Sequence, residues 1–152
     1  MRGKTAFWII VAAIVIPAVG MSVFAWRMVG AVRRDAEVTD SRLREVAWQC
    51  LAYADEFGGF PTAEAELRAF RAADQLKRPG EGFPATRAAT LAAADSSAPP
   101  TFDECLESVE IEWPIARDVQ PILRSKGKPT LNGTAPTVGQ WLFAMARVVR
   151  GG

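Results

Sequence analysis

The fold of this chain is decided by residues 6–26, AFWIIVAAIVIPAVGMSVFAW, a stretch without one charged side chain. As a helix it would span about 30 Å, the hydrocarbon thickness of a bilayer, at about 1.5 Å of rise per residue. Trp8 and Trp26 lie at its two ends, where amphipathic rings prefer the headgroup level. Pro17 lies inside it, which membrane helices tolerate. The stretch therefore predicts a transmembrane helix over residues 6–30.

A cleaved signal peptide is the alternative interpretation of the same stretch. Val23, Phe24 and Ala25 offer residues small enough for a processing site. However, the apolar run is longer than the roughly 7–15 residues of a signal-peptide core. The helical pattern also continues past the candidate cleavage site. We therefore expect an uncleaved signal-anchor and a single-pass membrane protein.

The charges that flank the stretch do not decide its orientation. Arg2 and Lys4 precede it, and three arginines follow it before Asp35. Basic residues favour the cytoplasmic side of a membrane, but an excess of one is too small to choose a side. The cysteines weakly favour an exported domain, and the family resemblance described below favours it more strongly. We expect residues 1–5 to form a cytoplasmic tail and residues 31–152 to form an extracytoplasmic domain.

Composition excludes several classes of function. The chain has 152 residues, with 18 Lys and Arg against 17 Asp and Glu and a formal net charge of +1. This balance argues against a nucleic-acid partner, which requires a basic surface. The chain contains no histidine, so Ser-His-Asp and Cys-His catalysis and histidine-ligated metal sites are ruled out. We expect no enzymatic activity, no cofactor and no metal site, and the lipid bilayer as one partner.

Cys50 and Cys105 are the two cysteines of the chain. They are too far apart in the sequence for a CxxC redox motif and too few for a zinc site. In an oxidising compartment they could pair as a disulfide. In a reducing compartment they would be two small hydrophobic side chains. Both alternatives stay open at the level of the sequence.

Residues 39–59 predict an amphipathic helix that follows the anchor without a helix breaker between them. Asp40 and its neighbours supply N-cap chemistry at its start, and the glycine pair at 58–59 supplies a stop. Charged and polar side chains, Glu45 and Asp55 among them, fill one side. Apolar side chains at i, i+3, i+4 and i+7 spacing form a packing face on the other side. This packing face consists of Leu43, Val46, Ala47, Cys50, Leu51 and Ala54.

Shorter elements are expected after this helix. Thr62 is placed to cap a helix that extends to about residue 76. Residues 77–101 are rich in Gly, Pro, Ala and Ser and predict a loop-rich linker, with a helical turn or two within residues 86–94. Thr101 and Glu104 fit a capping box at the start of a short helix.

The C-terminal third predicts at least one strand and a final helix. Residues 109–116 alternate apolar and polar side chains, which is typical of a half-buried strand. Residues 118–126 fit either a short helix or a second strand. Residues 128–136 predict a loop, and Thr137 caps the final helix. The expected fold class is α+β: a long N-terminal helix, with a transmembrane half and an amphipathic half, packs on a small, mainly helical domain with few strands.

One stretch resembles a known family. Residues 43–61, LREVAWQCLAYADEFGGFP, followed by Glu66 and Leu67, resemble type IV pilin-like proteins, particularly the major pseudopilins of type II secretion. In that family the end of the long N-terminal helix carries an aliphatic stripe, a tyrosine, an acidic pair, a glycine stop and an aromatic-proline pair. The family's prepilin-peptidase site is absent, since Gly3 is followed by Lys4.

The resemblance covers about residues 1–70 and implies a helix that begins in the membrane and ends on a small α+β head outside it. It implies a non-enzymatic role in a secretion or pilus-like envelope assembly. Copies of the chain or other assembly subunits would then be its partners, and the packing face would meet either its own domain or a sister chain. The alternative function is a membrane-tethered binding or accessory domain whose ligand the sequence does not identify.

Overall fold

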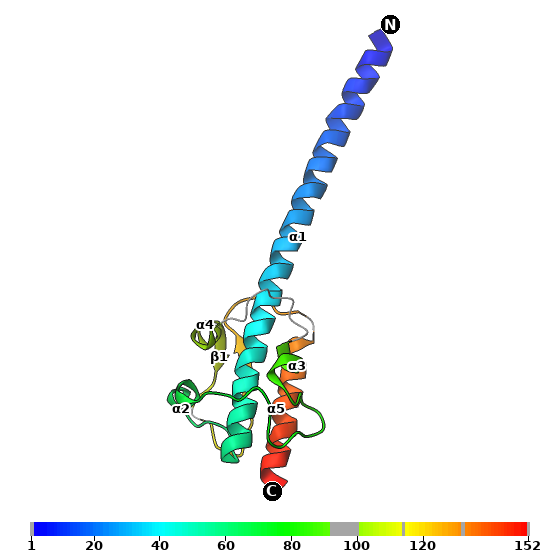
Figure 1. Ribbon diagram of the computed structural model, residues 1–152. Helices are drawn as coiled ribbons and strands as arrows, with labels where there is room; N and C mark the ends of the chain where they lie inside the picture. The colour runs from blue at the N-terminus through cyan, green and yellow to red at the C-terminus, as the bar shows by residue number, and fades with distance from the viewer. Residues whose placement is uncertain (1, 92–100, 114, 132, 152) are drawn as a thin grey trace. The chain divides into compact units, whose positions relative to one another are not determined.

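The computed structural model describes residues 2–91, 101–113, 115–131 and 133–151 (Figure 1). Its elements, in order, are α1 (Arg2–Phe57), α2 (Glu64–Ala69), α3 (Arg87–Leu91), α4 (Phe102–Ser108), β1 (Val109–Ile111), β2 (Leu123–Ser125) and α5 (Thr134–Gly151). The α+β class is confirmed, because a long N-terminal helix packs against a small domain of helices with a two-stranded antiparallel sheet. The chain divides into two compact units, Met1–Arg34 and Asp35–Gly152.

The first unit consists of the N-terminal part of α1. The helix continues through Pro17, as expected for a membrane-type apolar helix. From residue 15 to residue 29 every side chain is exposed, and most of them are apolar. Ile16 is 70% exposed, Met21 73% and Trp26 85%. The apolar side chains of residues 15–29 therefore have no protein to pack against.

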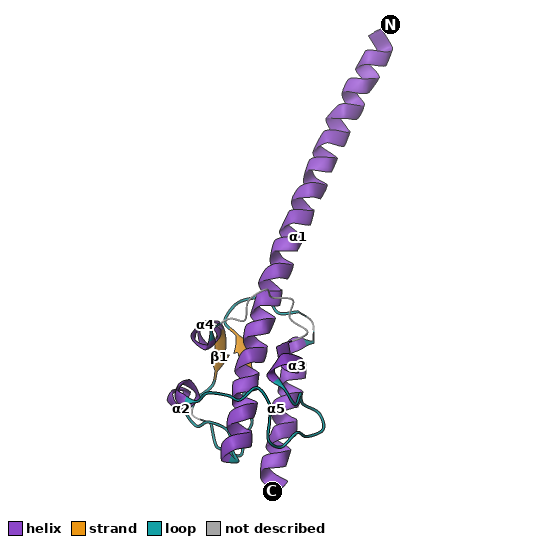
Figure 2. Cartoon of the chain, in the orientation of Figure 1, coloured by secondary structure: helices purple, strands orange, loops and turns teal. Residues whose placement is uncertain are grey.

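In the second unit the C-terminal part of α1 lies among the other elements. Figure 2 shows these helices, strands and loops around α1. α2, α4 and β1 lie on one side of α1, and α3 and α5 lie on the other. α5 runs beside α1 in the same direction (Figure 1). Side chains from these elements form one hydrophobic core. Its large and completely buried members include Trp48, Phe60, Leu67 and Leu142.

The polar side predicted for the amphipathic helix is only partly exposed to solvent, since Glu56 is exposed but several carboxylates of this region are buried. Asp40 is 3% exposed, Glu45 is 1% exposed and Asp55 is 5% exposed. The N-cap role predicted for Asp40 is wrong, because α1 passes through this position without a break. Loops and short helices cover α1 on the polar side as well as on the apolar side. Its carboxylates are buried because they bond to those covering segments.

The end of α1 is as predicted, but the helix after it is shorter than predicted. Gly58 takes a φ of 68°, which L-residues other than glycine rarely adopt, and its N–H bonds to the carbonyl of Ala54 at 2.9 Å. α2 ends at Ala69 instead of extending to residue 76. The backbone of residues 70–76 bonds elsewhere, since the Trp48 indole N–H donates to the Ala73 carbonyl at 3.1 Å. Tertiary contacts here override local helix propensity.

The capping box predicted at Thr101 is confirmed, and the strand after α4 is shorter than predicted. Glu104 N–H lies 3.4 Å from Thr101 Oγ1, and the Glu104 carboxylate accepts from Thr101 N–H at 3.2 Å. β1 covers only the first three of the eight residues expected, because its partner β2 is also three residues long. The strand alternative is therefore correct for part of residues 118–126. Parts of three predicted segments lie outside the described residues. They are residue 114 of the strand predicted over residues 109–116, residue 132 of the predicted loop and residues 92–100 of the predicted linker.

The final helix begins three residues before the predicted cap at Thr137. The Asp40 carboxylate accepts a hydrogen bond from Thr134 Oγ1 at 2.6 Å and another from Leu131 N–H at 3.1 Å. Asp40 thus anchors the chain at the first residue of α5 from a position far away in the sequence. Pro136 fits in the first turn of this helix, where its missing N–H has no intrahelical partner.

We expect the substitution Asp40→Asn to lower the free energy of unfolding by about 1–3 kcal/mol, because an amide offers one acceptor oxygen to two donors, of which the Thr134 hydroxyl is buried. Urea unfolding of the full chain in detergent would measure the loss. Asp118→Asn is the matched control, since Asp118 is exposed. Equal stability of the two variants would show that Asp40 does not hold α5 in place.

Candidate functional site

Glu45 and Arg87 form an ion pair inside the domain and join α1 to α3. Arg87 Nε lies 2.9 Å from Glu45 Oε2 and 3.2 Å from Glu45 Oε1. Gln49 Nε2 donates to Glu45 Oε1 at 3.3 Å. The hydrogen bond with Glu45 raises the pKa of the Arg87 guanidinium, which therefore stays charged. A carboxylate with its oxygens occupied in this way serves as a structural link and not as an available general base.

Asp55 holds the chain that follows the extended segment 70–76. Its carboxylate accepts hydrogen bonds from the backbone N–H groups of Lys77 at 2.5 Å and Arg78 at 3.2 Å. Arg78 Nε adds an ion pair at 3.1 Å. Because the carboxylate is nearly all buried, these donors replace the water that it gives up on folding.

Glu66 joins the end of α1 to the turn at Thr62. Its carboxylate accepts from Thr62 N–H at 2.8 Å, from Thr62 Oγ1 at 3.1 Å and from the Tyr53 hydroxyl at 3.1 Å. Thr62 therefore does not cap α2 as predicted. Instead, the side chain of Glu66 on α2 accepts hydrogen bonds from Thr62. The hydrogen bond from Thr62 N–H lowers the pKa of Glu66. The pKa of Tyr53 is raised mainly by its burial, and to a smaller extent by its hydrogen bond with Glu66. Glu66 is therefore ionised and Tyr53 neutral at neutral pH.

Cys50 and Cys105 are free, buried thiols in the structure. Burial raises the pKa of each thiol to about 12. Since the thiolate is the nucleophilic form, neither side chain suits covalent catalysis at neutral pH. The disulfide between them stays a prediction that depends on the redox state of the compartment.

The packing face is completely buried inside the domain. None of its side chains has any exposed surface, and the set is Leu43, Val46, Ala47, Cys50, Leu51 and Ala54. The sequence left two partners open for this face, its own domain or a sister chain. In the structure its own domain covers the whole face. A second protein chain would therefore have to bind to other residues.

No group of three or more potential metal ligands occurs among the described residues. Small hollows lie on the described part of the domain. One of about 350 Å³ is lined by residues around Trp113 and Ile122, and one of about 290 Å³ by residues around Phe57 and Phe70. Neither brings together an acid, a base and a nucleophile in a catalytic arrangement.

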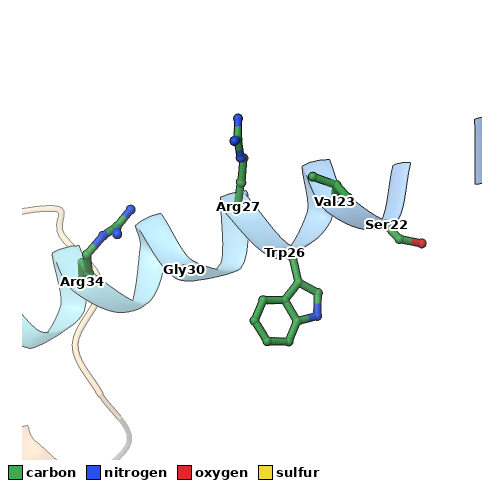
Figure 3. A pocket seen from close by; sticks show the side chains of 6 residues that line it. All are labelled: Ser22, Val23, Trp26, Arg27, Gly30 and Arg34. Carbon is green, nitrogen blue, oxygen red and sulfur yellow. The ribbon is translucent and has the colours of Figure 1, made fainter. Parts of the chain in front are cut away.

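A further hollow, of about 720 Å³, lies in the first unit. Its six lining residues all come from α1 and are Ser22, Val23, Trp26, Arg27, Gly30 and Arg34 (Figure 3). Because one helix cannot enclose a substrate and exclude water from it, this hollow is unsuited to catalysis. Its side chains could still hold a charged group at the surface of the helix.

Sequence reasoning missed the structural carboxylates of the domain. Asp40, Glu45 and Asp55 were assigned to a helix start or a polar face, and each instead bonds to a segment distant in the sequence. Hydrophobic periodicity cannot distinguish a carboxylate that meets water from one that meets backbone N–H groups of a covering loop. The sequence offered one signal for these buried carboxylates: acidic side chains on a helix that is followed by a long loop-rich segment.

No protein-family model matches this chain, and no curated protein and no solved structure matches it significantly. Among the described residues one helix is long and apolar enough to cross a membrane, and none of its apolar window is buried. This N-terminal helix is consistent with a single-pass membrane anchor. Its length and composition also fit a signal sequence.

We expect acid to destabilise the domain through Glu66. The pKa of this carboxyl in the folded chain lies below its ordinary value of 4.5, so its stabilising contribution is complete above pH 4.5. It is lost as the pH falls below that value, when the folded state must also take up the proton. Glu66→Gln should therefore lose less stability than the native chain between pH 5 and pH 3, as urea unfolding at several pH values would measure.

Glu107→Gln is the control for this experiment, since it removes an exposed carboxylate from α4. It should keep the pH dependence of the native chain. If native and Glu66→Gln proteins lost stability in parallel below pH 4.5, the hydrogen bonds around Glu66 would not be responsible.

Proposed function

We propose that this chain is a membrane-anchored, non-enzymatic protein of the cell envelope, with residues 6–30 in the bilayer and residues 31–152 outside the cytoplasm. The observation that carries the proposal is the exposed apolar surface of α1. Side chains such as Ile16, Val19 and Phe24 are more than half exposed, and water would make that exposure unfavourable. Lipid acyl chains would cover these side chains at no such cost.

A non-enzymatic role is supported by how the reactive groups of the domain are used. Glu45, Asp55 and Glu66 each accept several hydrogen bonds from the chain itself. Both thiols have a pKa of about 12. The sequence contains no histidine. The groups that usually perform acid–base or nucleophilic chemistry are thus absent or occupied.

A role in a secretion or pilus-like assembly is supported by the cluster at the end of α1. Tyr53, the stop at Gly58, the buried Phe60 and Glu66 belong to the stretch that resembles pilin-like proteins. In this domain they fix the point where the long helix ends and the small head begins. The second candidate is a tethered binding or accessory domain, which the exposed hollow beside Trp113 and Ile122 would serve.

Membrane orientation can be tested with one new cysteine, in the substitution Gln140→Cys on the exposed side of α5. We expect a membrane-impermeant maleimide to label this variant in right-side-out membrane vesicles without permeabilisation. The label should stay with a full-length chain that resists alkaline extraction, because the anchor is not cleaved. Gel mobility of the labelled chain would measure all of these outcomes.

The native chain is the matched control, since its thiols are buried and have a pKa of about 12. It should react only after denaturation. Labelling of Gln140→Cys only after permeabilisation would place the domain in the cytoplasm. A shortened chain released by alkaline extraction would instead identify residues 6–26 as a cleaved signal peptide.

Assembly can be tested by amine-reactive crosslinking of the full chain in its membranes. The domain offers Lys77, which is exposed, together with Lys126 and Lys128 on the segment after β2. If the chain is a subunit of an envelope assembly, we expect a ladder of products beyond the dimer. Products no larger than the monomer at a native expression level would favour the tethered binding domain. Crosslinking after dilution into detergent controls for random collision.

A further inference from the structure

Residues 27–34, which follow the apolar run, present two chemically different faces. At about 100° of rotation per residue, Arg27, Gly30 and Arg34 fall within a sector of about 60° on α1. Met28, Val29 and Val32 lie on the opposite side and are each more than half exposed. A helical segment with one basic face and one apolar face is typical of the boundary between acyl chains and headgroups.

The basic face forms one side of the hollow in the first unit. Figure 3 shows Arg27 and Arg34 on one side of the helix, the Trp26 ring on the other, and Gly30 between them. Arg27 and Arg34 are separated by about 10.5 Å along the helix axis, so both flexible side chains can reach one group above Gly30. We call this hollow, with Arg27 and Arg34 at its edge, the arginine hollow. Because Gly30 has no side chain, the space between the two arginines is left open.

The arginine hollow carries positive charge that the described residues do not neutralise. Neither Arg27 nor Arg34 makes a hydrogen bond or an ion pair with another described residue. The sequence has no acidic residue before Asp35. Each guanidinium presents five N–H donors in a planar fork. Such donors match a phosphate better than a carboxylate or a neutral ligand.

We propose that the arginine hollow binds the phosphate of an anionic phospholipid headgroup. This inference rests on the proposed membrane anchoring of α1. The hollow begins at the end of the apolar run, where a lipid phosphate would lie, and Trp26 is the type of residue that prefers this level.

Native mass spectrometry of the full chain in detergent tests the proposal, with phosphatidylglycerol or phosphatidylcholine added at equal concentration. We expect at least tenfold more retention of the anionic lipid. The variant with both Arg27→Gln and Arg34→Gln should lose this preference, at about fivefold for each arginine. Arg33→Gln is the matched control, because it removes one neighbouring charge outside the hollow and should leave the preference within about twofold.

Gly30→Leu separates a site from a general positive field. A Cβ at Gly30 meets no atom within 4 Å, so the helix accepts the leucine while its side chain fills the hollow. Both arginines remain, yet the preference for the anionic lipid should fall at least fivefold. If Gly30→Leu kept the full preference, or if Arg33→Gln lost as much as the double variant, the positive charge would be delocalised and the proposal would be wrong.

Two further outcomes concern the source of the phosphate and the anchor itself. Competition by millimolar glycerol phosphate as strong as that of the lipid would overturn the assignment to a membrane lipid. Equal retention of both lipids by a chain that still resists alkaline extraction would overturn the headgroup site alone. A native chain that alkaline extraction releases would overturn the anchor, and the lipid site with it.

Discussion

Every buried backbone N–H and C=O group of a protein needs a hydrogen-bond partner, and this domain has little regular structure to supply one. Apart from α1 and α5 its elements are three to seven residues long. Long connecting segments therefore pass over α1 with unpaired donors. Carboxylates on α1 meet this need: Asp40 accepts from Leu131 N–H, and Asp55 accepts from the N–H groups of Lys77 and Arg78.

Burying a carboxylate is unfavourable unless its charge is paired and its oxygens are hydrogen-bonded. Glu45 satisfies this condition through Arg87 and Gln49, and Asp55 through Arg78 and two backbone donors. Such bonds are directional, whereas apolar contacts tolerate sliding. The carboxylates thus specify which loop lies at which level of α1, and the hydrophobic core supplies most of the driving force.

The extent to which the sequence predicts this structure depends on what surrounds each element. The apolar stretch, the packing face, the stop at Gly58 and the capping box at Thr101 follow from local patterns, because each pattern reports one dominant neighbour. The early end of α2 and the early start of α5 do not. They depend on Trp48 and Asp40, which bond to segments that are distant in the sequence. The same reason explains why Glu45 and Asp55 were assigned to a polar face.

The candidate site follows the same rule. Cys50 and the packing face could be identified by their spacing. In the structure these side chains are buried in the core, so they have no surface for a ligand or partner. The groups that remain available lie where no protein covers α1, at Trp26, Arg27 and Arg34. The buried carboxylates on the covered part of the helix already have intramolecular partners. Binding of an anionic group by α1 is therefore expected at the end of its apolar run, where its unpaired donors would meet the membrane surface.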